Sequence, residues 1–151
     1  MGRRKRVTAK LVIAPNEILT KVCEPVADGE DVSGIIRDMM HILTNSKNGV
    51  GLAAPQAGHL KRIIIVKESD CAYLVMINPS IKQNSGSFVT IDEGCLSYPG
   101  TYKPIERITS ILANYKTEGG SCVENARFDN FQARIIQHEV DHLNGRCKVG
   151  E

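Results

Sequence analysis

The segment His138-Glu139-Val140-Asp141-His142 has the residue types and the spacing of a metal site. Each residue of an α-helix turns by about 100°, so two histidines four positions apart lie only about 40° from each other and can hold one metal ion. Glu139 and Asp141 flank the pair, and helix geometry alone does not choose which of them takes a proton from a water held there. The alternative is an exposed helix that matches the pattern by chance.

The surrounding residues favour a buried helix. We expect it to begin near Asp129-Asn130, with Asp129 and Gln132 as a capping box, and to end at Asn144-Gly145. A helix that is apolar nearly all round belongs in the interior, where buried histidines and carboxylates need a strong partner such as a metal ion. The apolar residues on the face opposite the histidines are Ile136, Val140 and Leu143, and those on the histidine side are Phe131 and Ile135.

A third metal ligand is available in Glu93-Gly94-Cys95-Leu96-Ser97, where the cysteine lies in a turn that ends an apolar strand. A lone cysteine is more often a small buried apolar residue, so both interpretations stay open at this point. The odd number of cysteines and the absence of a Cys-x-x-Cys pair are typical of a reducing compartment. The cysteines that we interpret as structural are Cys23, Cys71, Cys122 and Cys147.

Small residues dominate the segment from Gly49 to Gln56, which reads GVGLAAPQ. Two glycines and two alanines allow the backbone to approach another group closely. The segment is not a phosphate-binding loop, because the Gly-x-Gly-x-x-Gly pattern fails at its sixth position and no strand is expected before it.

Together and in this order, the three segments resemble the peptide deformylase family, whose motifs are Gly-x-Gly-x-Ala-Ala-x-Gln, Glu-Gly-Cys-x-Ser and His-Glu-x-Asp-His. Every defining position matches, and the likeness covers about residues 10–147; further similar positions are Pro15, Leu19, Asn78-Pro79 and Gln137. The resemblance implies a metal-dependent hydrolase. Such an enzyme removes the formyl group from the N-terminal formyl-methionine of newly synthesised polypeptides and releases formate.

The resemblance also implies roles for single residues. Glu139 would be the general base and then the acid that protonates the leaving amine, while the Gln56 side-chain amide and the Leu96 backbone N–H would hold the oxyanion. The implied ion is one divalent metal, with Fe(II) as the native choice and Zn(II), Ni(II) or Co(II) as alternatives. Its ligands would be Cys95, His138 and His142, with water as the fourth.

Two further groups of residues are expected around the metal. The residues expected to contact the peptide or the methionine side chain are Val50, Gly51, Gly94, Phe131, Arg134 and Ile135. Those expected to orient the metal ligands are Glu93, Arg107 and Asp141, although a surface ion pair is the alternative for the first two.

The sequence departs from the family pattern in two places. Position 102 is Tyr, where many bacterial members have an arginine that helps to hold the peptide backbone. The sequence also ends nine residues after His142, where many members continue into a further helix. We therefore expect residues 1–151 to form a single monomeric domain without a C-terminal helical extension, as in some phage-encoded members.

The elements that must position these residues can be predicted from periodicity. Residues 31–46 form a helix with an apolar stripe, and strands are expected at residues 62–66, 73–77 (ending at Asn78-Pro79), 87–91 and 105–115, after a loop-rich segment at 7–26. Strands gathered between two helices indicate an α+β fold. The resemblance makes it deformylase-like, with antiparallel sheets packed around a central metal-binding helix.

Composition limits the remaining classes. Of 151 residues 42% are hydrophobic, so the chain is not disordered, and the longest apolar runs, residues 63–66 and 72–77, are too short to span a membrane. A net charge of +2 does not favour a specific nucleic-acid partner. The basic cluster at residues 3–6 is interpreted as a solvated arm, with contact to nucleic acid or to an anionic surface as the alternative, and no apolar signal segment follows it. We expect a cytoplasmic enzyme (host cytoplasm if phage-encoded) that acts on formyl-methionyl nascent peptides, with the ribosome near its exit tunnel as a candidate partner and no membrane.

Two other functions remain to be weighed. One is a general metallopeptidase that cleaves internal peptide bonds, against which Cys95 argues, because such zinc enzymes use His or Glu as the third ligand. The other is a catalytically silent relative that only binds peptides, against which intact Glu139, Gln56 and Cys95 argue.

Overall fold

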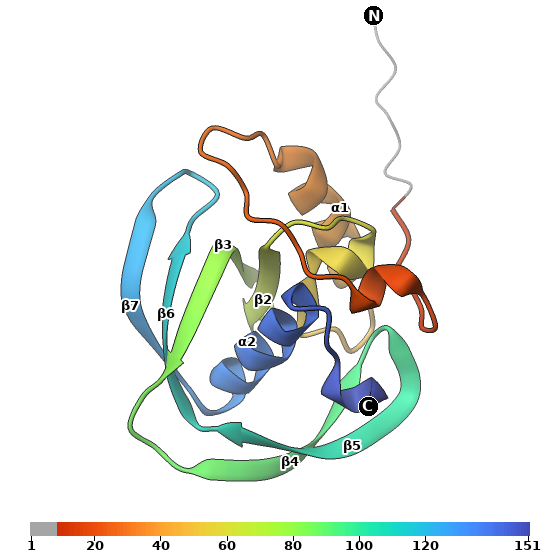
Figure 1. The fold of residues 1–151 in the computed structure, drawn as a ribbon, viewed down its shortest axis with the longest axis vertical. Coiled ribbons are helices and arrows are strands. Elements are labelled where there is room, and N and C mark those ends of the chain that lie inside the picture. The colour runs from red at the N-terminus through yellow and green to blue at the C-terminus, as the bar shows by residue number, and fades with distance from the viewer. Residues whose placement is uncertain (1–8) are drawn as a thin grey trace, which may run out of the picture.

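The computed structural model describes residues 9–151, so the basic cluster at residues 3–6 lies outside the described residues. The helices are η1 (Glu17–Thr20), α1 (Ser33–Thr44), η2 (Ala54–Ala57), α2 (Asn130–Leu143) and η3 (Lys148–Gly150), of which the three η elements are short 3-10 helices. The strands are β1 (Gly51–Ala53), β2 (Ile63–Ser69), β3 (Ala72–Gln83), β4 (Phe88–Cys95), β5 (Tyr98–Ile108), β6 (Ser110–Lys116) and β7 (Cys122–Asp129) (Figure 1).

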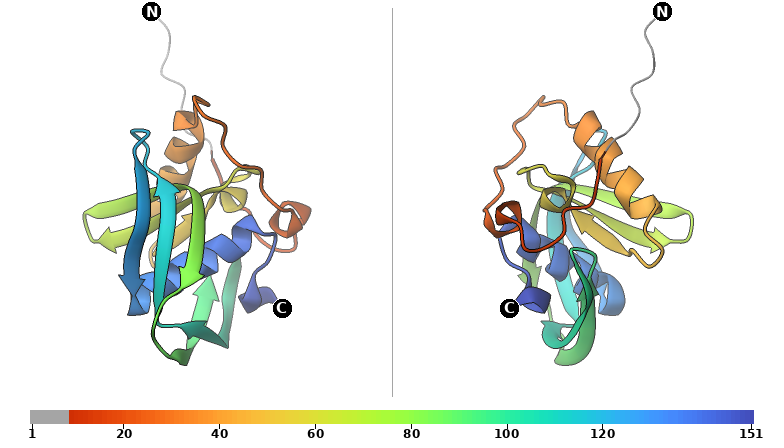
Figure 2. Two further views of the ribbon diagram at one scale, coloured as in Figure 1. Left: turned by 60° about the vertical axis from the view of Figure 1, so that its left-hand side comes forward. Right: turned by 90° about the vertical axis from the view of Figure 1, so that its right-hand side faces the viewer.

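The strands form two antiparallel sheets that enclose α2. The larger sheet has the order β1-β2-β3-β6-β7, and β4 pairs with β5 in a separate ribbon. Helix α2 packs against β1, β2 and β7 of the larger sheet and against β5 of the ribbon, and the left view of Figure 2 shows it behind β3, β6 and β7. The predicted α+β fold, with antiparallel sheets around a central helix, is therefore confirmed.

Strand β2 shows why the core needs both helices. Ile64 and Val66 belong to the apolar cluster formed with α2, while Ile63 and Ile65 belong to the cluster formed with α1. Side chains alternate between the two faces of a strand, so a strand covered on both faces is apolar at every position. This explains the uninterrupted apolar run at residues 63–66, and it fixes α2 against the sheet.

Both long helices lie where the periodicity predicted them. Helix α1 is two residues shorter at each end than expected, and α2 begins at Asn130 and stops at the predicted Asn144-Gly145 turn, where Gly145 has φ 74°. The predicted capping box is wrong. Asp129 makes no capping hydrogen bond, because its carboxylate accepts from Arg127 Nε at 3.0 and 3.1 Å instead.

Strand β3 does not end at Asn78-Pro79 as predicted but continues to Gln83. Its pairing shifts between Ile77 and Ser80, as it leaves β2 and pairs with β6. Asn78 adopts φ 52° there, and its side chain bonds both the N–H and the carbonyl of Val26. Proline is tolerated at such a bulge because no ladder donor is needed from it.

Two further strand predictions need correction, and two strands were missed. The segment 105–115 is not one strand: it splits at Thr109 into β5 and β6, which belong to different sheets. The predicted strand 87–91 extends as β4 to Cys95. Strand β7 was missed, because it is a largely exposed edge strand without a clear apolar alternation, and the short β1 within the glycine-rich segment was missed as well.

No helix among residues 9–151 combines the length and the apolar character needed to cross a bilayer.

Candidate metal centre

Four side chains bring metal-binding atoms together at one point beneath a cavity. Cys95 ends β4, His138 and His142 lie on α2, and Cys147 follows α2. Their sulfur and nitrogen atoms all lie within 4.8 Å of one another, and Cys95 Sγ lies 3.3 Å from His142 Nε2. The structure therefore brings together the three residues predicted as ligands. It also adds Cys147, which the sequence analysis treated as a structural cysteine.

The position of Cys147 is set by the turn that follows α2. Gly145 has a positive φ, and a Cβ on it would lie 2.5 Å from the Thr20 carbonyl oxygen, so the chain turns there in close contact with η1. Beyond the turn, Val149 is completely buried and packs with Ile105 and Cys147. The only sequence signal for this cysteine is its position shortly after the predicted helix stop. No spacing rule connects it to Cys95.

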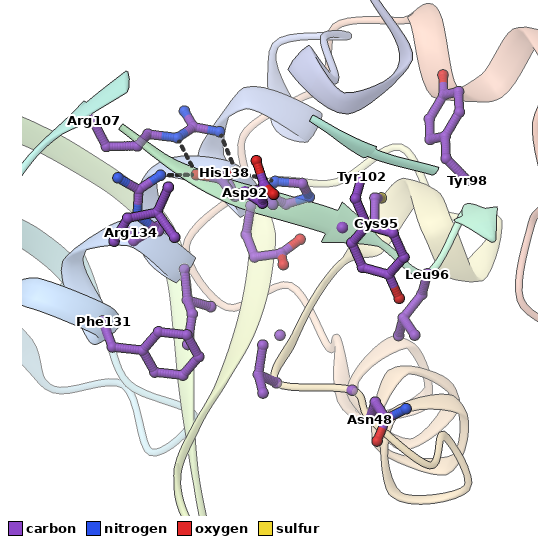
Figure 3. Close-up of a pocket in the computed structure, with 18 of the residues that line it drawn as sticks. Asn48, Asp92, Cys95, Leu96, Tyr98, Tyr102, Arg107, Phe131, Arg134 and His138 are labelled. Carbon is purple, nitrogen blue, oxygen red and sulfur yellow. Dashed lines mark hydrogen bonds and ion pairs between the residues drawn. The ribbon is translucent and has the colours of Figure 1, made fainter. Parts of the chain in front are cut away.

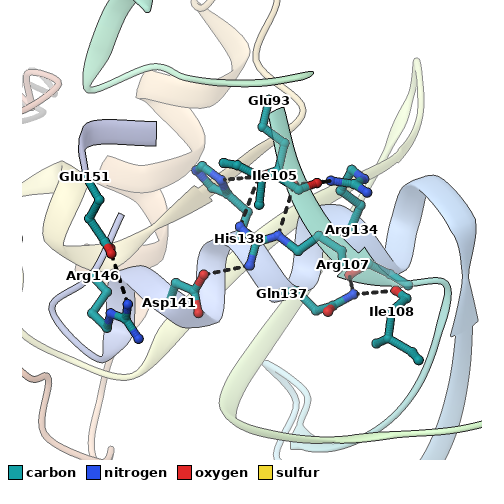
Figure 4. Close-up of polar contacts among 11 residues, drawn as sticks. Glu93, Ile105, Arg107, Ile108, Arg134, Gln137, His138, Asp141, Arg146 and Glu151 are labelled. Carbon is teal, nitrogen blue, oxygen red and sulfur yellow. Dashed lines mark hydrogen bonds and ion pairs between the residues drawn. The ribbon is translucent and has the colours of Figure 1, made fainter. Parts of the chain in front are cut away.

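Glu93 orients His138 through a buried network (Figure 4). Its Oε1 accepts from His138 Nδ1 at 3.0 Å and from Arg107 Nη2 at 3.0 Å, and its Oε2 accepts from Arg107 Nε at 2.9 Å and from Arg134 Nη1 at 2.5 Å. Arg107 Nη1 continues the network to Asp141 Oδ2 at 2.6 Å. A histidine that bonds a carboxylate through Nδ1 presents Nε2 to the opposite side, which is the usual arrangement around a protein-bound metal.

Sequence reasoning missed part of this network. Glu93 and Arg107 are only 7% and 4% exposed, so they do not form the surface ion pair considered as the alternative. Arg134 was predicted only to line the pocket. Its guanidinium donates hydrogen bonds to Glu93 and to the carbonyls of Ile105 and Val89.

The charges in the network are stabilised by one another. Burial alone would raise the pKa of Glu93, but the hydrogen bonds from His138 and Arg107 outweigh it and lower that pKa to about 2. Burial likewise opposes the charged form of His138, yet the hydrogen bond to Glu93 and the nearby Glu139 carboxylate raise its pKa. Glu93 is therefore ionised at neutral pH and holds the proton of His138 on Nδ1.

Glu139 lies beside the candidate ligand atoms, and its Oε1 has no hydrogen-bond partner within residues 9–151. Burial raises the pKa of its carboxyl, an effect that the two histidines counteract only in part. Gly51 makes room for it, because a Cβ at that position would lie 2.8 Å from Glu139 Oε2 and 2.6 Å from Ile135 Cγ2. A buried carboxyl with a raised pKa and a free oxygen is suited to general acid–base chemistry.

The donor set fits a divalent metal ion. Besides Glu139 Oε1, the buried His142 Nδ1 has no partner among the described residues, and an unpaired polar atom in the interior is costly unless a ligand compensates. The hydrogen bond between the two thiols raises the pKa of Cys95 and lowers that of Cys147, and the neighbouring histidines contribute to the lowering. Sulfur and imidazole are ligands that zinc and iron accept.

Gln56 points its amide group into the same site from η2. Its Oε1 accepts from the Ala53 backbone N–H at 2.9 Å, which leaves Nε2 directed at Ser97 Oγ (3.1 Å) and at Cys95 Sγ (3.6 Å). The side chain is only 1% exposed. A fixed, buried N–H donor next to the ligand atoms can stabilise negative charge that develops there.

The lining of a cavity of about 880 Å³ includes His138 and Glu139, and Figure 3 shows His138, Cys95 and Phe131 among the residues around it. Its volume falls in the range of small-ligand and peptide side-chain sites. Phe131 is 63% exposed at its rim, whereas Ile135 is buried deeper in it. The residues predicted to contact substrate all belong to its lining: Val50, Gly51, Gly94, Phe131, Arg134 and Ile135, together with Leu96 and Gln56.

Tyr102 stands at the rim of this cavity with 70% of its surface exposed. It lies opposite Gly94 in the β4–β5 ribbon, and a Cβ on Gly94 would come within 2.6 Å of the Tyr102 ring. An aromatic ring that covers a cross-strand glycine shields the backbone of the ribbon. Tyr102 thus forms part of the cavity wall beside Cys95.

Comparison with known proteins gives one consistent result. The family described as polypeptide deformylase matches residues 8–149. Peptide deformylase 1 of Clostridium perfringens is 44% identical over 133 residues, which cover 86% of this chain and 88% of that protein.

Solved structures agree with the sequence relatives. A class I type b peptide deformylase from Acinetobacter baumannii superposes with a TM-score of 0.86 at 37% identity, covering 97% of this chain and all of that one. The same type of enzyme bound to Met-Ala-Ser gives a TM-score of 0.82 at 35% identity, with 95% and 98% covered.

Proposed function

Because the chain belongs to the peptide deformylase family, we propose that its cavity binds the formyl-methionyl end of newly synthesised polypeptides and that its metal centre hydrolyses the formyl amide. The products are formate and a free N-terminal amine. The observation that supports the proposal is Glu139, a buried carboxyl in the cavity lining with one oxygen unpaired among the described residues. It lies beside the side chains that could hold a metal ion.

Peptide deformylases are metalloenzymes, and we assign the metal to Cys95, His138 and His142. A divalent ion bound there supplies a Lewis acid and lowers the pKa of water. The protein keeps its ligands in register through Glu93, which fixes the tautomer of His138, and through Arg107, which fixes Glu93.

Glu139 moves the proton in this proposal. Its carboxylate takes a proton from the attacking water and then gives it to the nitrogen of the departing methionine, so one residue serves as base and acid in turn. Burial raises the pKa of this carboxyl, which favours the protonated form that the second transfer needs. The Gln56 Nε2 amide and the Leu96 backbone N–H hold the oxyanion, each contributing about 3–4 kcal/mol to the transition state.

The shape and polarity of the cavity support methionine as the side chain recognised. Ile135 and Phe131 give it an apolar wall, and the methylenes of Arg134 extend that wall because the guanidinium is held elsewhere. Val50, Gly51 and Gly94 present backbone to a peptide lying along the rim. Binding of Met-Ala-Ser by the Acinetobacter relative supports the same substrate class here.

Fe(II) is our proposal for the native ion, with Zn(II), Ni(II) and Co(II) as alternatives. A thiolate ligand next to Fe(II) makes oxidation easy. We therefore expect activity to depend on anaerobic loading with Fe(II), or on Ni(II) or Co(II), and to be weaker with Zn(II). Full activity in a chelator-treated sample without metal would overturn the mechanism.

The direct test is formate release from formyl-Met-Ala peptides by the metal-loaded protein. Acetyl-Met-Ala and a long unformylated peptide with many internal bonds serve as controls. We expect formate and free Met-Ala from the first substrate alone. Cleavage of the long peptide would instead indicate a general metallopeptidase, and tight binding without turnover would indicate a silent relative.

The place of action follows as a finer proposal. Nascent formylated chains emerge at the ribosome exit tunnel in the cytoplasm, or in the host cytoplasm for a phage-encoded enzyme, and we propose that the protein acts there. Co-sedimentation with ribosomes at physiological salt tests the association. A free enzyme that deformylates released chains equally well would argue against it.

A further inference from the structure

A second cysteine lies within reach of the metal that the three predicted ligands would hold. Cys147 Sγ shares a cluster with the ligand atoms of Cys95, His138 and His142 in which no two atoms are more than 4.8 Å apart. Cys147 is 7% exposed, so its thiol is part of the interior and not of the protein surface. The thiol of Cys147 has no role in the proposed deformylation chemistry.

The dimensions of the cluster suit four-fold coordination. With metal–sulfur bonds of about 2.3 Å and metal–nitrogen bonds of about 2.0–2.1 Å, a tetrahedral ion places its ligand atoms about 3.4–3.8 Å apart. One observed separation is the 3.3 Å between Cys95 Sγ and His142 Nε2, and none of the separations exceeds 4.8 Å. The widest pair therefore needs to close by only about 1 Å, which side-chain rotation can supply.

The backbone holds Cys147 at this point from both sides. On one side, Gly145 turns the chain sharply against the Thr20 carbonyl. On the other, Val149 is fully buried, and Gly150 lies so close to the Tyr98 ring that an added Cβ would be 2.4 Å from it. A cysteine fixed in this way meets the metal without the entropy cost of ordering a mobile segment.

We infer that Cys147 is a fourth protein ligand, so that the resting site is a closed Cys₂His₂ centre. Two thiolates and two imidazoles form the donor set of structural zinc sites, whereas catalytic sites keep one position open. With Cys147 bound, no position is left for water or for the formyl oxygen. Catalysis then requires the thiolate of Cys147 to leave the ion, which makes this residue a brake on the enzyme.

The inference rests on the metal centre of the proposed function but is tested without turnover. Co(II) is loaded into the reduced wild-type protein and into Cys147→Ala, and ligands are counted by X-ray absorption and by the sulfur-to-Co(II) charge-transfer band. Cys122→Ala, which removes an exposed thiol on β7, is the matched control.

We expect two sulfur and two nitrogen ligands in the wild type and in Cys122→Ala. In Cys147→Ala we expect one sulfur ligand, about half the charge-transfer intensity and an added oxygen ligand. Zn(II) affinity in this variant should fall by more than the 10–100-fold typical of losing an outer hydrogen-bond partner. One sulfur ligand in the wild type would overturn the inference, and this measurement does not depend on whether the variant folds.

Formate release on the same samples separates the two proposals. If Cys147 is a brake, Cys147→Ala should deformylate at least about tenfold faster per bound ion than the wild type, the effect of removing about 1.4 kcal/mol of competition. One sulfur ligand in the wild type together with normal formate release would support the deformylase function and refute Cys147 as the fourth ligand. Two sulfur ligands in the wild type, without formate release by the wild type or any variant, would support Cys147 as a ligand and refute the deformylase function.

Discussion

Replacement of Glu93 by Gln tests how the network behind the metal centre is built. Four donors converge on this carboxylate, two on each oxygen: Arg107 Nη2 and His138 Nδ1 on Oε1, and Arg107 Nε and Arg134 Nη1 on Oε2. An amide replaces one oxygen by a group that only donates. Whichever way it is turned, two of the four contacts become donor against donor, and two arginines lose their buried counter-charge.

The magnitude follows from these contacts. Hydrogen bonds to charged groups contribute about 1.5–3 kcal/mol each, and breaking a buried ion pair from one side costs about 3–5 kcal/mol. We expect Glu93→Gln to lower the free energy of unfolding by about 3–5 kcal/mol. For a chain of this length that corresponds to a fall in Tm of about 6–20 °C. Loss of the hydrogen bond to His138 should also weaken metal binding by about 10–100-fold.

The pH dependence of stability gives an independent check. The pKa of Glu93 is about 2 in the folded protein against an ordinary value of 4.5. A lowered pKa stabilises the fold above the unfolded value, and that stabilisation is lost as the pH falls from about 4.5 toward 2. The difference is worth about 3 kcal/mol. The difference in the free energy of unfolding between wild type and Glu93→Gln should therefore become smaller as the pH falls from about 4.5 toward 2.

The assay is urea denaturation of the metal-free proteins between pH 3 and 7, with metal affinity measured separately at neutral pH. Glu106→Gln is the control, since Glu106 lies on the same ribbon but is exposed and should change stability by no more than about 0.5 kcal/mol. If Glu93→Gln is as stable as Glu106→Gln at pH 6, the carboxylate does not hold the network together and our reasoning is wrong.

Three further substitutions test the site itself. Glu139→Gln should keep the fold and the metal while kcat falls by about 10²–10⁴; a near wild-type rate with metal bound would assign the proton transfer elsewhere. Gly51→Ala places a Cβ 2.8 Å from Glu139 Oε2, so kcat should fall by about 10²-fold as the carboxylate is displaced. The control Gly34→Ala, in the first turn of α1, adds a Cβ that meets only Arg37 Nη2 at 3.7 Å and should leave kcat unchanged. Asp141→Asn weakens only the outer end of the network, at Arg107. Metal affinity should therefore fall by about tenfold, at the lower end of the 10–100-fold range, while kcat per bound ion stays unchanged. Loss of kcat with the metal fully bound would contradict this prediction.

The helices show how far local pattern carries a prediction. The apolar stripe of α1 and the stop signal at Asn144-Gly145 located both long helices to within two residues. Helical periodicity depends on residues three and four apart, which the sequence displays directly. The failures lie in the sheets: residues 105–115 look like one strand because burial continues while the chain passes from one sheet to the other at Thr109.

The sequence by itself determined which residues are candidates for the chemistry. His138 and His142 share a face because of helix geometry, and Glu139 and Cys95 stand in motifs whose order along the chain identifies the family. These features are local, so they can be recognised without knowing how distant segments of the chain meet.

Only the tertiary structure decided what surrounds those residues. Three contacts join segments between 41 and 88 residues apart: Arg134 with Glu93, Gly51 with Glu139, and Cys147 with Cys95. Cys147 is close in sequence only to His142. Such contacts depend on where turns like that at Gly145 redirect the chain, and on which faces of the two sheets pack against α2. Periodicity records which side of an element is buried but not which distant residue it meets. For that reason Cys147 could be added to the candidate ligands only in three dimensions.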